Sequence, residues 1–490
     1  MAGVGFELKK LFRTKGFLGA ARAYVYSTIV TVGPFAFCTI LIVTLLILLN
    51  YLKVPFKEKE LFVATIVYAF IFSQIVSSGF RMIITRFIAD TLYRRQFDDI
   101  LPSLYGLLSI VVTVGGVIGV LFMYSSPLPF EVKLLSYLLY MALIVVFSMM
   151  EYLSTIKDYV KIVKSFVSGI AVSVIMAFVL LRLTNLREVV SLLLSMNSGF
   201  LITISMLISY LKSFFGRPSK SSTNYYRFLT YFDRFPSLFF VALFYTLGLY
   251  SHNFVFWASD LRVTVADTYV YAPIYDVPTF YAFLSILPSM IVFVVSVETS
   301  FYEKYRTYYN LITGKGNFED IEDARKDMTR VLWAEIWNMM EIQLFFSLIS
   351  IAAGYYLLPR IGFTQVSIDI FNILVLGAYM NAIMLVVILT LLYFEDRKGA
   401  LFVSSSYLLT NVVFTYITLI YGENLYGLGF FMAAFLSLVM ALIELVVYLR
   451  NIHYHTFCGQ PIIQKEREGI FTNLVSFFER KQSFNKQTTN

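Results

Sequence analysis

The chain has 490 residues, of which 58% are hydrophobic and only 14% are charged. An average soluble domain carries about 25% charged residues, so this composition excludes an ordinary soluble enzyme and indicates a protein whose solvent is a lipid bilayer. The formal net charge of +8 does not indicate nucleic-acid binding, because the distribution of charge between loops has a simpler explanation in membrane topology.

Apolar runs long enough to cross a membrane recur along the whole chain. About 20 residues cross the hydrocarbon as a helix, which satisfies every backbone polar group internally. The sequence therefore predicts an all-α integral membrane protein with twelve transmembrane helices. In chain order they are expected at 24–50, 61–82, 101–124, 132–153, 162–181, 189–211, 237–256, 280–300, 334–358, 368–393, 400–421 and 428–450.

Two polar segments flank these spans. Residues 1–23 set Phe6 and Leu8 against Lys9 and Lys10, a pattern typical of an amphipathic segment at the cytoplasmic membrane interface. Binding of a partner protein is the alternative. The tail at 451–490 is polar and too small for a catalytic domain.

Basic residues give the expected orientation. With both termini in the cytoplasm, 31 of the 39 Lys and Arg residues fall in cytoplasmic segments, as the positive-inside rule requires. We therefore expect a multi-pass protein of the cell membrane with cytoplasmic termini. The same charge also favours contact with anionic membrane lipids.

A basic, serine-rich linker divides the chain in two. It spans 212–235, between a six-helix bundle at 24–211 and a second at 236–450. In each half a long helix extends into the cytoplasm before an acidic turn, FDDI at 97–100 and FEDI at 318–321. This echo favours an internal repeat, which is common in transporters, and a chance similarity between membrane helices is the alternative.

Motifs of enzymatic chemistry are missing from the sequence. It has neither GxxxxGK[ST] nor HExxH, and its three histidines and two cysteines give little basis for a metal site. We therefore predict no catalytic residues, no metal and no cofactor, and a protein that is not an enzyme.

Polar residues inside or beside the predicted spans are the candidates for a substrate path or for ion coupling. Charges are costly there and usually face a cavity or a partner, whereas Asn and Gln also serve as interhelical hydrogen bonders. The candidates are Glu298, Tyr302, Tyr305, Glu341, Glu444, Arg81, Arg86, Gln74 and Asn197.

One stripe of candidates follows the eighth span. Glu298, Tyr302, Tyr305 and Tyr309 share a helix face. They form either an aromatic belt at the membrane surface or a lining at the cytoplasmic mouth, where flat rings stack on sugars.

Several segments resemble the PelG family, the inner-membrane transporters of Pel exopolysaccharide. They are MAGVGFELKKLFR with GAARAYVYSTIVTVGPF near the start, TRFIADTLYRRQF at 85–97, APIYDVPTFYAFLSILPS at 272–289, VETSFYEKYRTYY at 297–309 and LYFEDRKGAL at 392–401. The family would have an SGPW-like sequence where this chain has VGPF at 32–35. That departure removes any role for a tryptophan there.

The resemblance implies a fold and a partner. Transporters of this multidrug/oligosaccharidyl-lipid/polysaccharide exporter type have two six-helix bundles around a central cavity and work by alternating access. The implied substrate is an N-acetylhexosamine-rich exopolysaccharide. The implied partners are a cytoplasmic glycosyltransferase and other membrane subunits of a synthase complex. The alternatives are a MATE-like ion-coupled small-molecule antiporter and a lipid-linked oligosaccharide flippase.

Overall fold

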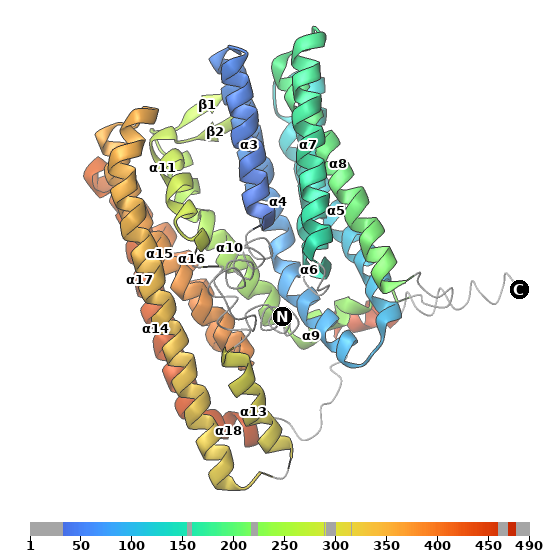
Figure 1. Cartoon of the computed structure of the whole chain (residues 1–490), viewed down its shortest axis with the longest axis vertical. Helices are drawn as coiled ribbons and strands as arrows, with labels where there is room; N and C mark the ends of the chain where they lie inside the picture. Colours follow the sequence, from blue (N-terminus) through green and yellow to red (C-terminus); the bar gives the residue numbers. More distant parts are fainter. Residues whose placement is uncertain are drawn as a thin grey trace, which may run out of the picture. The chain divides into compact units, whose positions relative to one another are not determined.

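The computed structural model describes residues 33–153, 159–216, 224–288, 290, 300–314, 316–458 and 469–476. The expected amphipathic segment at 1–23 and the candidate Glu298 lie outside the described residues. Most of the described chain is helical. Its longer helices are α3 (Gly33–Tyr51), α4 (Phe56–Tyr93), α5 (Ile100–Tyr124), α6 (Phe130–Leu153), α7 (Tyr159–Leu183), α8 (Glu188–Phe215), α10 (Pro236–Trp257), α11 (Pro273–Leu284), α13 (Tyr302–Thr313), α14 (Phe318–Leu357), α15 (Gln365–Tyr393), α16 (Arg397–Tyr421) and α17 (Leu428–Arg450) (Figure 1).

Short elements join these helices. They are η1 (Phe97–Asp99), η2 (Arg227–Leu229), α9 (Thr230–Arg234), β1 (Val263–Val265), β2 (Tyr269–Tyr271), η4 (Leu358–Ile361), η5 (Glu423–Leu425) and α18 (Ile452–Phe457).

Ten helices of the described residues are long and apolar enough to cross a membrane, and each coincides with one expected span. The two other expected spans, 24–50 and 280–300, are described only in part, by α3 and α11. A multi-pass membrane protein is therefore confirmed, and the total of twelve helices stays a prediction.

The start of α14 corrects the sequence-based interpretation. We expected an acidic turn at 318–321 and a span from 334, but the helix already begins at Phe318 and has 40 residues. At 1.5 Å per residue it is about 60 Å long, twice the hydrocarbon thickness. Its first turn is stabilised by a capping box in which Asn317 and Asp320 bond each other's backbone N–H groups.

The described residues form two compact units. The N-terminal unit contains Pro34–Leu247 and Val263–Tyr271, and the C-terminal unit contains Gly248–Arg262 and Ala272–Pro461, in each case as far as the chain is described. Helix α10 begins in the first unit and ends in the second.

Small residues bring two helices of the N-terminal unit into close contact. Gly169 and Ser173 lie on α7, and Gly199 and Thr203 lie on α8. A Cβ atom at either glycine would collide with a hydroxyl group or a carbonyl oxygen of the other helix. Such small-residue contacts replace the hydrophobic driving force that membrane helices lack.

A β-hairpin, absent from our predictions, caps one end of the N-terminal unit. Strands β1 and β2 pair antiparallel with Val263 opposite Tyr271. The Tyr68 hydroxyl on α4 binds both the N–H of Val270 at 2.8 Å and its carbonyl at 2.7 Å. The Tyr271 hydroxyl donates to Glu60 at 2.8 Å. We call this the hairpin end, and the end with η1, η2 and α9 the linker end.

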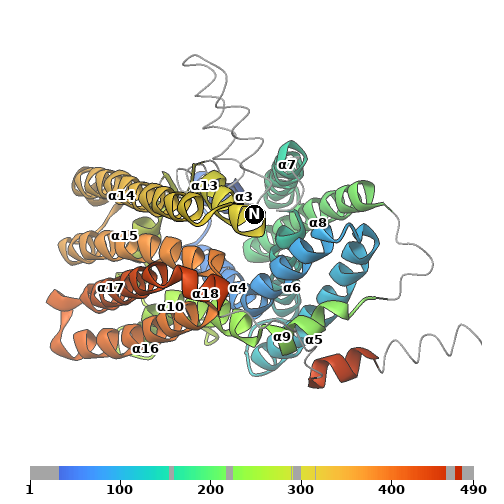
Figure 2. The ribbon, with the colours of Figure 1, turned by 90° about the horizontal axis from the view of Figure 1, so that it is seen from below.

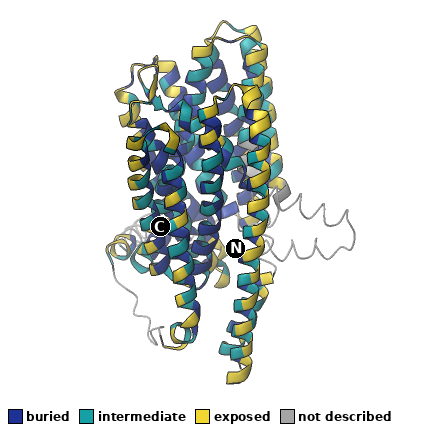
Figure 3. Cartoon of the chain, turned by 90° about the vertical axis from the view of Figure 1, so that its left-hand side faces the viewer, coloured by how far each residue is buried: buried dark blue, intermediate teal, exposed yellow. Residues whose placement is uncertain are grey.

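The C-terminal unit is built around α15. This helix packs against α11, α14, α16 and α17 (Figure 2), and Gly377 on it admits the ring of Phe430 from α17. Buried and exposed residues alternate along the outer helices of the unit, so that each helix has a buried face and an exposed face (Figure 3). The exposed faces are rich in Leu, Ile, Val and Phe, which is the composition expected of surfaces that contact lipid.

The contact between α7 and α8 yields a stability prediction. Gly199→Val should lower the free energy of unfolding by about 1–3 kcal/mol, because the added methyl groups overpack a tight crossing. Leu201→Val, at a position of the same helix that is 63% exposed, is the matched control and should have little effect. Thermal unfolding of the purified protein in detergent measures both. Equal melting temperatures for the two variants would contradict the close contact.

Candidate functional site

Arg81 and Glu151 form an ion pair near the linker end of the N-terminal unit. Arg81 Nε on α4 lies 3.0 Å from Glu151 Oε1 on α6, and the Thr85 hydroxyl donates to Glu151 Oε2 at 3.1 Å. The Glu151 side chain is 20% exposed and that of Arg81 is 43% exposed. A charged pair at the end of membrane-spanning helices is a candidate functional group, and the guanidinium remains accessible to a ligand.

Arg86 lies one turn further along α4 and helps to anchor the linker. It pairs with Asp90 at 3.4 Å, and its guanidinium lies 5.5 Å from the ring centre of Phe235. Asp90 also accepts a hydrogen bond from the Tyr231 hydroxyl at 2.9 Å. Burial first, and then the Asp90 charge, raises the pKa of Tyr231 to about 12. Arg86 thus contacts residues of its own helix and of the linker.

The two amide candidates differ in their surroundings. Asn197 on α8 is buried and donates to the carbonyl of Leu135 on α6 at 3.0 Å and to that of Leu193 at 2.8 Å. It therefore bonds across two helices. Gln74 is half-buried on α4 and lies seven residues before Arg81, on the same face of the helix.

Tyr305 belongs to an aromatic cluster at one end of the C-terminal unit. Its ring centre lies 4.6 Å from that of Tyr309, 5.6 Å from Tyr393 and 5.8 Å from Phe394. Its hydroxyl donates to the Tyr393 carbonyl at 3.2 Å. Burial first, and then the nearby acidic groups of Tyr309 and Glu395, raise the pKa of Tyr305. Tyr302 begins α13 beside this cluster and is half-buried.

The two remaining glutamates lie apart from each other. Glu341 is on an exposed face of α14, whereas Gln343, two residues on, is buried and donates to the Ser285 carbonyl at 3.3 Å. Glu444 packs on α17 against Gly399, where an added Cβ would collide with both Glu444 and Asp396. Asp396 Oδ2 has no hydrogen-bond partner among the described residues, so two carboxyl groups meet there.

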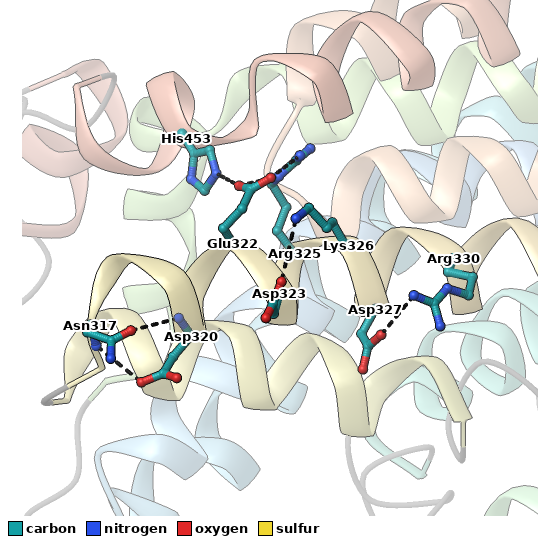
Figure 4. A network of polar contacts seen from close by, with 9 residues as sticks. All are labelled: Asn317, Asp320, Glu322, Asp323, Arg325, Lys326, Asp327, Arg330 and His453. Atoms are coloured by element: carbon teal, nitrogen blue, oxygen red, sulfur yellow. Dashed lines mark hydrogen bonds and ion pairs between the residues drawn. The ribbon is translucent and has the colours of Figure 1, made fainter.

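A polar network lies along the N-terminal part of α14, residues 318–333 (Figure 4). We call these residues the projecting part of α14. Glu322 lies between Arg325, at 2.6 Å, and His453 of α18, at 2.9 Å. It precedes the apolar part of the helix, and the hydrogen bonds from Arg325 and His453 lower its pKa to about 2. The pairs Asp323–Lys326 and Asp327–Arg330 continue the network along the helix. These i,i+3 pairs favour a helix in water.

A residue outside our site candidates organises the YDVPTF segment. Asp276 accepts hydrogen bonds from Asn253 Nδ2 at 2.7 Å, Trp257 Nε1 at 2.8 Å and the N–H of Ala272 at 2.7 Å. The carboxylate thus ties the end of α10 to the start of α11. The available signal for the helix start was Pro273, which occupies the first position of α11, where proline is favoured.

The fold is that of a known class of transporter. An outward-facing multidrug resistance MATE family transporter of the MOP superfamily has a TM-score of 0.59 at 11% identity, over 92% of this chain and 98% of that chain. A MOP superfamily transporter from Pyrococcus furiosus Vc1 has a TM-score of 0.56 at 12% identity, over 88% and 96%. The inward-facing conformation of a MATE family transporter has a TM-score of 0.51 at 11% identity, over 81% and 92%.

The fold is therefore that of the MATE and MOP superfamily transporters. The family model PelG, described as "Putative exopolysaccharide Exporter (EPS-E)", matches residues 1–457. No curated protein sequence matches the chain. The chain belongs to the PelG family, as its sequence motifs predicted.

The pair of Arg81 and Glu151 gives the second prediction. Arg81→Met should lower stability by about 1–3 kcal/mol, because it leaves a largely buried carboxylate without its charged partner. The double variant Arg81→Met/Glu151→Gln should recover part of that loss, because it removes both charges and leaves no carboxylate without a charged partner. Thermal unfolding in detergent measures the series. The single variant Glu151→Gln completes the cycle, and losses of the two single variants that add up to the loss of the double variant would show that the two groups do not interact.

Proposed function

We propose that this chain exports a Pel-type exopolysaccharide rich in N-acetylhexosamine across the cell membrane, with both termini in the cytoplasm. The match of the PelG family model to residues 1–457 carries this proposal. A transporter fold supports it, and so does the strong bias of basic residues toward the segments expected in the cytoplasm. In this proposal the polymer passes through a central cavity by alternating access.

Specific residues are proposed to contact the polymer or to couple its movement. In the N-terminal unit these are Arg81 and Gln74, which share a face of α4. In the C-terminal half of the chain they are Tyr302, which lies beside the aromatic cluster of Tyr305, and Glu298, which lies outside the described residues. Tyrosine rings suit a sugar path because their faces pack on the apolar faces of pyranose rings while their hydroxyl groups bond sugar hydroxyls.

Other candidates fit coupling or packing better. Glu444 beside Asp396 is a proposed site of proton or cation coupling, because two carboxyl groups at close range favour a shared proton or a bound cation. Arg86 and Asn197 are engaged in contacts within the N-terminal unit, and we propose that they position the helices that carry the path. The exposed Glu341 has no proposed contact with the polymer.

A cytoplasmic glycosyltransferase is the proposed partner, together with other membrane subunits of a synthase complex. The length of α14 supports a docking role, because a helix of 40 residues is about twice as long as the hydrocarbon is thick. Its N-terminal part is stabilised by its own cap and ion pairs. Its exposed side chains carry both signs of charge, among them Asp323 and Lys326. Such a surface gives specificity to a contact that forms and dissociates in water.

Export is tested with substitutions at the proposed path. Tyr302→Ala and Glu298→Gln should each lower exported polymer several-fold while the amount of protein in the membrane stays the same, because each removes a proposed substrate contact. Tyr355→Ala, at a residue 56% exposed on α14, is the control. Cells that express each variant are compared for secreted polymer. Export equal to wild type in both path variants would remove these residues from the site.

The partner is tested by photo-crosslinking. A benzoylphenylalanine in place of Asp323, whose side chain is 80% exposed, should capture a glycosyltransferase in cells. The same probe in place of Phe130, 76% exposed at the hairpin end, should not capture it. Mass spectrometry identifies the captured protein. Capture from both positions or from neither would contradict docking at α14.

A further inference from the structure

The C-terminal tail of the chain returns to the N-terminal unit. Residues 470–476 are helical, and we call them the tail helix. The tail helix belongs to the N-terminal unit, whereas α18, which ends at Phe457, belongs to the C-terminal unit. It lies beside α9 (Figure 2). The end of the chain therefore leaves one unit and packs into the other.

A carboxylate of the linker caps the tail helix. Asp233 Oδ2 on α9 accepts hydrogen bonds from the N–H and the hydroxyl of Thr472, both at 2.7 Å. Its Oδ1 accepts the N–H of Phe471 at 3.4 Å. The first N–H groups of a helix have no partner within it, and aspartate is among the best residues to bind them. A Cβ atom at Gly469 would collide with the same carboxylate, so the approach is close.

Apolar side chains reinforce this cap. The ring centre of Phe471 lies 5.3 Å from that of Phe232 on α9. The Phe232 ring in turn contacts Phe80 of α4 and Phe239 of α10, at 5.6 and 5.5 Å. Val475 follows Phe471 by one helical turn and is 5% exposed. The tail helix thus adds a fourth ring to an aromatic cluster that joins three helices.

The tail helix depends on the linker for its folding. An isolated helix shorter than about 12 residues is marginal in water, and the described part of the tail helix covers only residues 470–476. Its fold therefore requires the cap and the apolar surface that α9 supplies. Because the contact consists of one cap and one apolar face, it is able to release while the larger helices of the unit stay packed.

Covalent geometry limits how far a docked tail lets the two units separate. The chain from Phe457 to Gly469 has twelve residue steps and spans at most about 40 Å when fully extended. While the tail helix is docked, the end of α18 cannot move further than this from Gly469. Both α9 and α18 lie in segments that the distribution of basic residues assigns to the cytoplasm. The limit therefore acts on the cytoplasmic side.

We propose that the tail helix is a releasable strap that restrains separation of the two units on the cytoplasmic side. With the strap docked, the end of α18 stays close to α9. With the strap released, more open arrangements become populated. The strap does not depend on which substrate the chain carries, and it lies beyond residue 457, where the match to the family model ends.

Cysteine labelling in lipid nanodiscs tests whether the tail helix is docked. In a chain whose two native cysteines are replaced by serine, Val475→Cys should react with a maleimide at least tenfold more slowly than Leu474→Cys, at a position 39% exposed. Asp233→Ala should abolish this difference, because it removes the cap. Glu131→Ala, at an exposed position of α6, is the matched control and should preserve it. Equal rates without Asp233→Ala, or protection that survives it, would overturn the proposal.

Spin-label distances test whether the docked tail restrains the units. Labels at Tyr93→Cys, 91% exposed at the end of α4, and at Tyr454→Cys, 64% exposed on α18, report the separation by double electron–electron resonance. Asp233→Ala should at least double the population at longer distances. Phe471→Ala, which releases the tail helix without changing the linker, should do the same, and Glu131→Ala should not. A wild-type distribution in either release variant would overturn the proposal.

Dilution separates a strap within one chain from an exchange of tails between two copies. With one chain per nanodisc, Val475→Cys should keep its protection. Loss of protection there would show that the tail helix docks on a second copy, and would overturn the strap. These measurements involve no polymer, so the proposed function can fail while the strap stands, and the strap can fail while the export experiment succeeds.

Discussion

Polar groups inside a bilayer must find partners within the protein, and this constraint accounts for most of the contacts described. Lipid offers no hydrogen bonds, so an unpaired polar group costs several kcal/mol. Asn197 joins α6 to α8, and Asn411 on α16 donates to the Gly248 carbonyl at 2.7 Å. Gln343 on α14 donates to the carbonyl of Ser285, in the segment after α11. Each amide thus forms a hydrogen bond between two segments of the chain. The Glu151 carboxylate finds its partners in the same manner, in Arg81 and Thr85 on α4.

Positions that escape this constraint are therefore informative. Asp396 Oδ2 has no hydrogen-bond partner among the described residues, and it lies next to another acidic side chain, that of Glu444. Arg81 satisfies Glu151 while much of its own surface remains accessible. A transporter needs such positions, because a substrate or an ion can bind only where the protein has left some bonding capacity unused.

Sequence reasoning predicted the helices better than the contacts between them. Apolar runs of about 20 residues are a strong signal, and ten of them coincide with helices. The start of α14 was missed because its charged residues look like a loop until their i,i+3 pairing is recognised. The strands at Val263 and Tyr269 have three residues each, too few for a periodic pattern. The pairing of Arg81 with Glu151 depends on how two helices are rotated, which hydropathy does not report. For the same reason the exposed position of Glu341 was not foreseen.

The tight crossing of α7 and α8 has a consequence for biogenesis. These helices follow each other in the chain and are joined by a few residues only, and their contact needs no group from the second half of the protein. We expect them to leave the insertion machinery as a preassembled pair while later spans are still being translated. Helix α6 precedes the pair in the chain and packs against α8, so it would already be in the membrane to receive the pair.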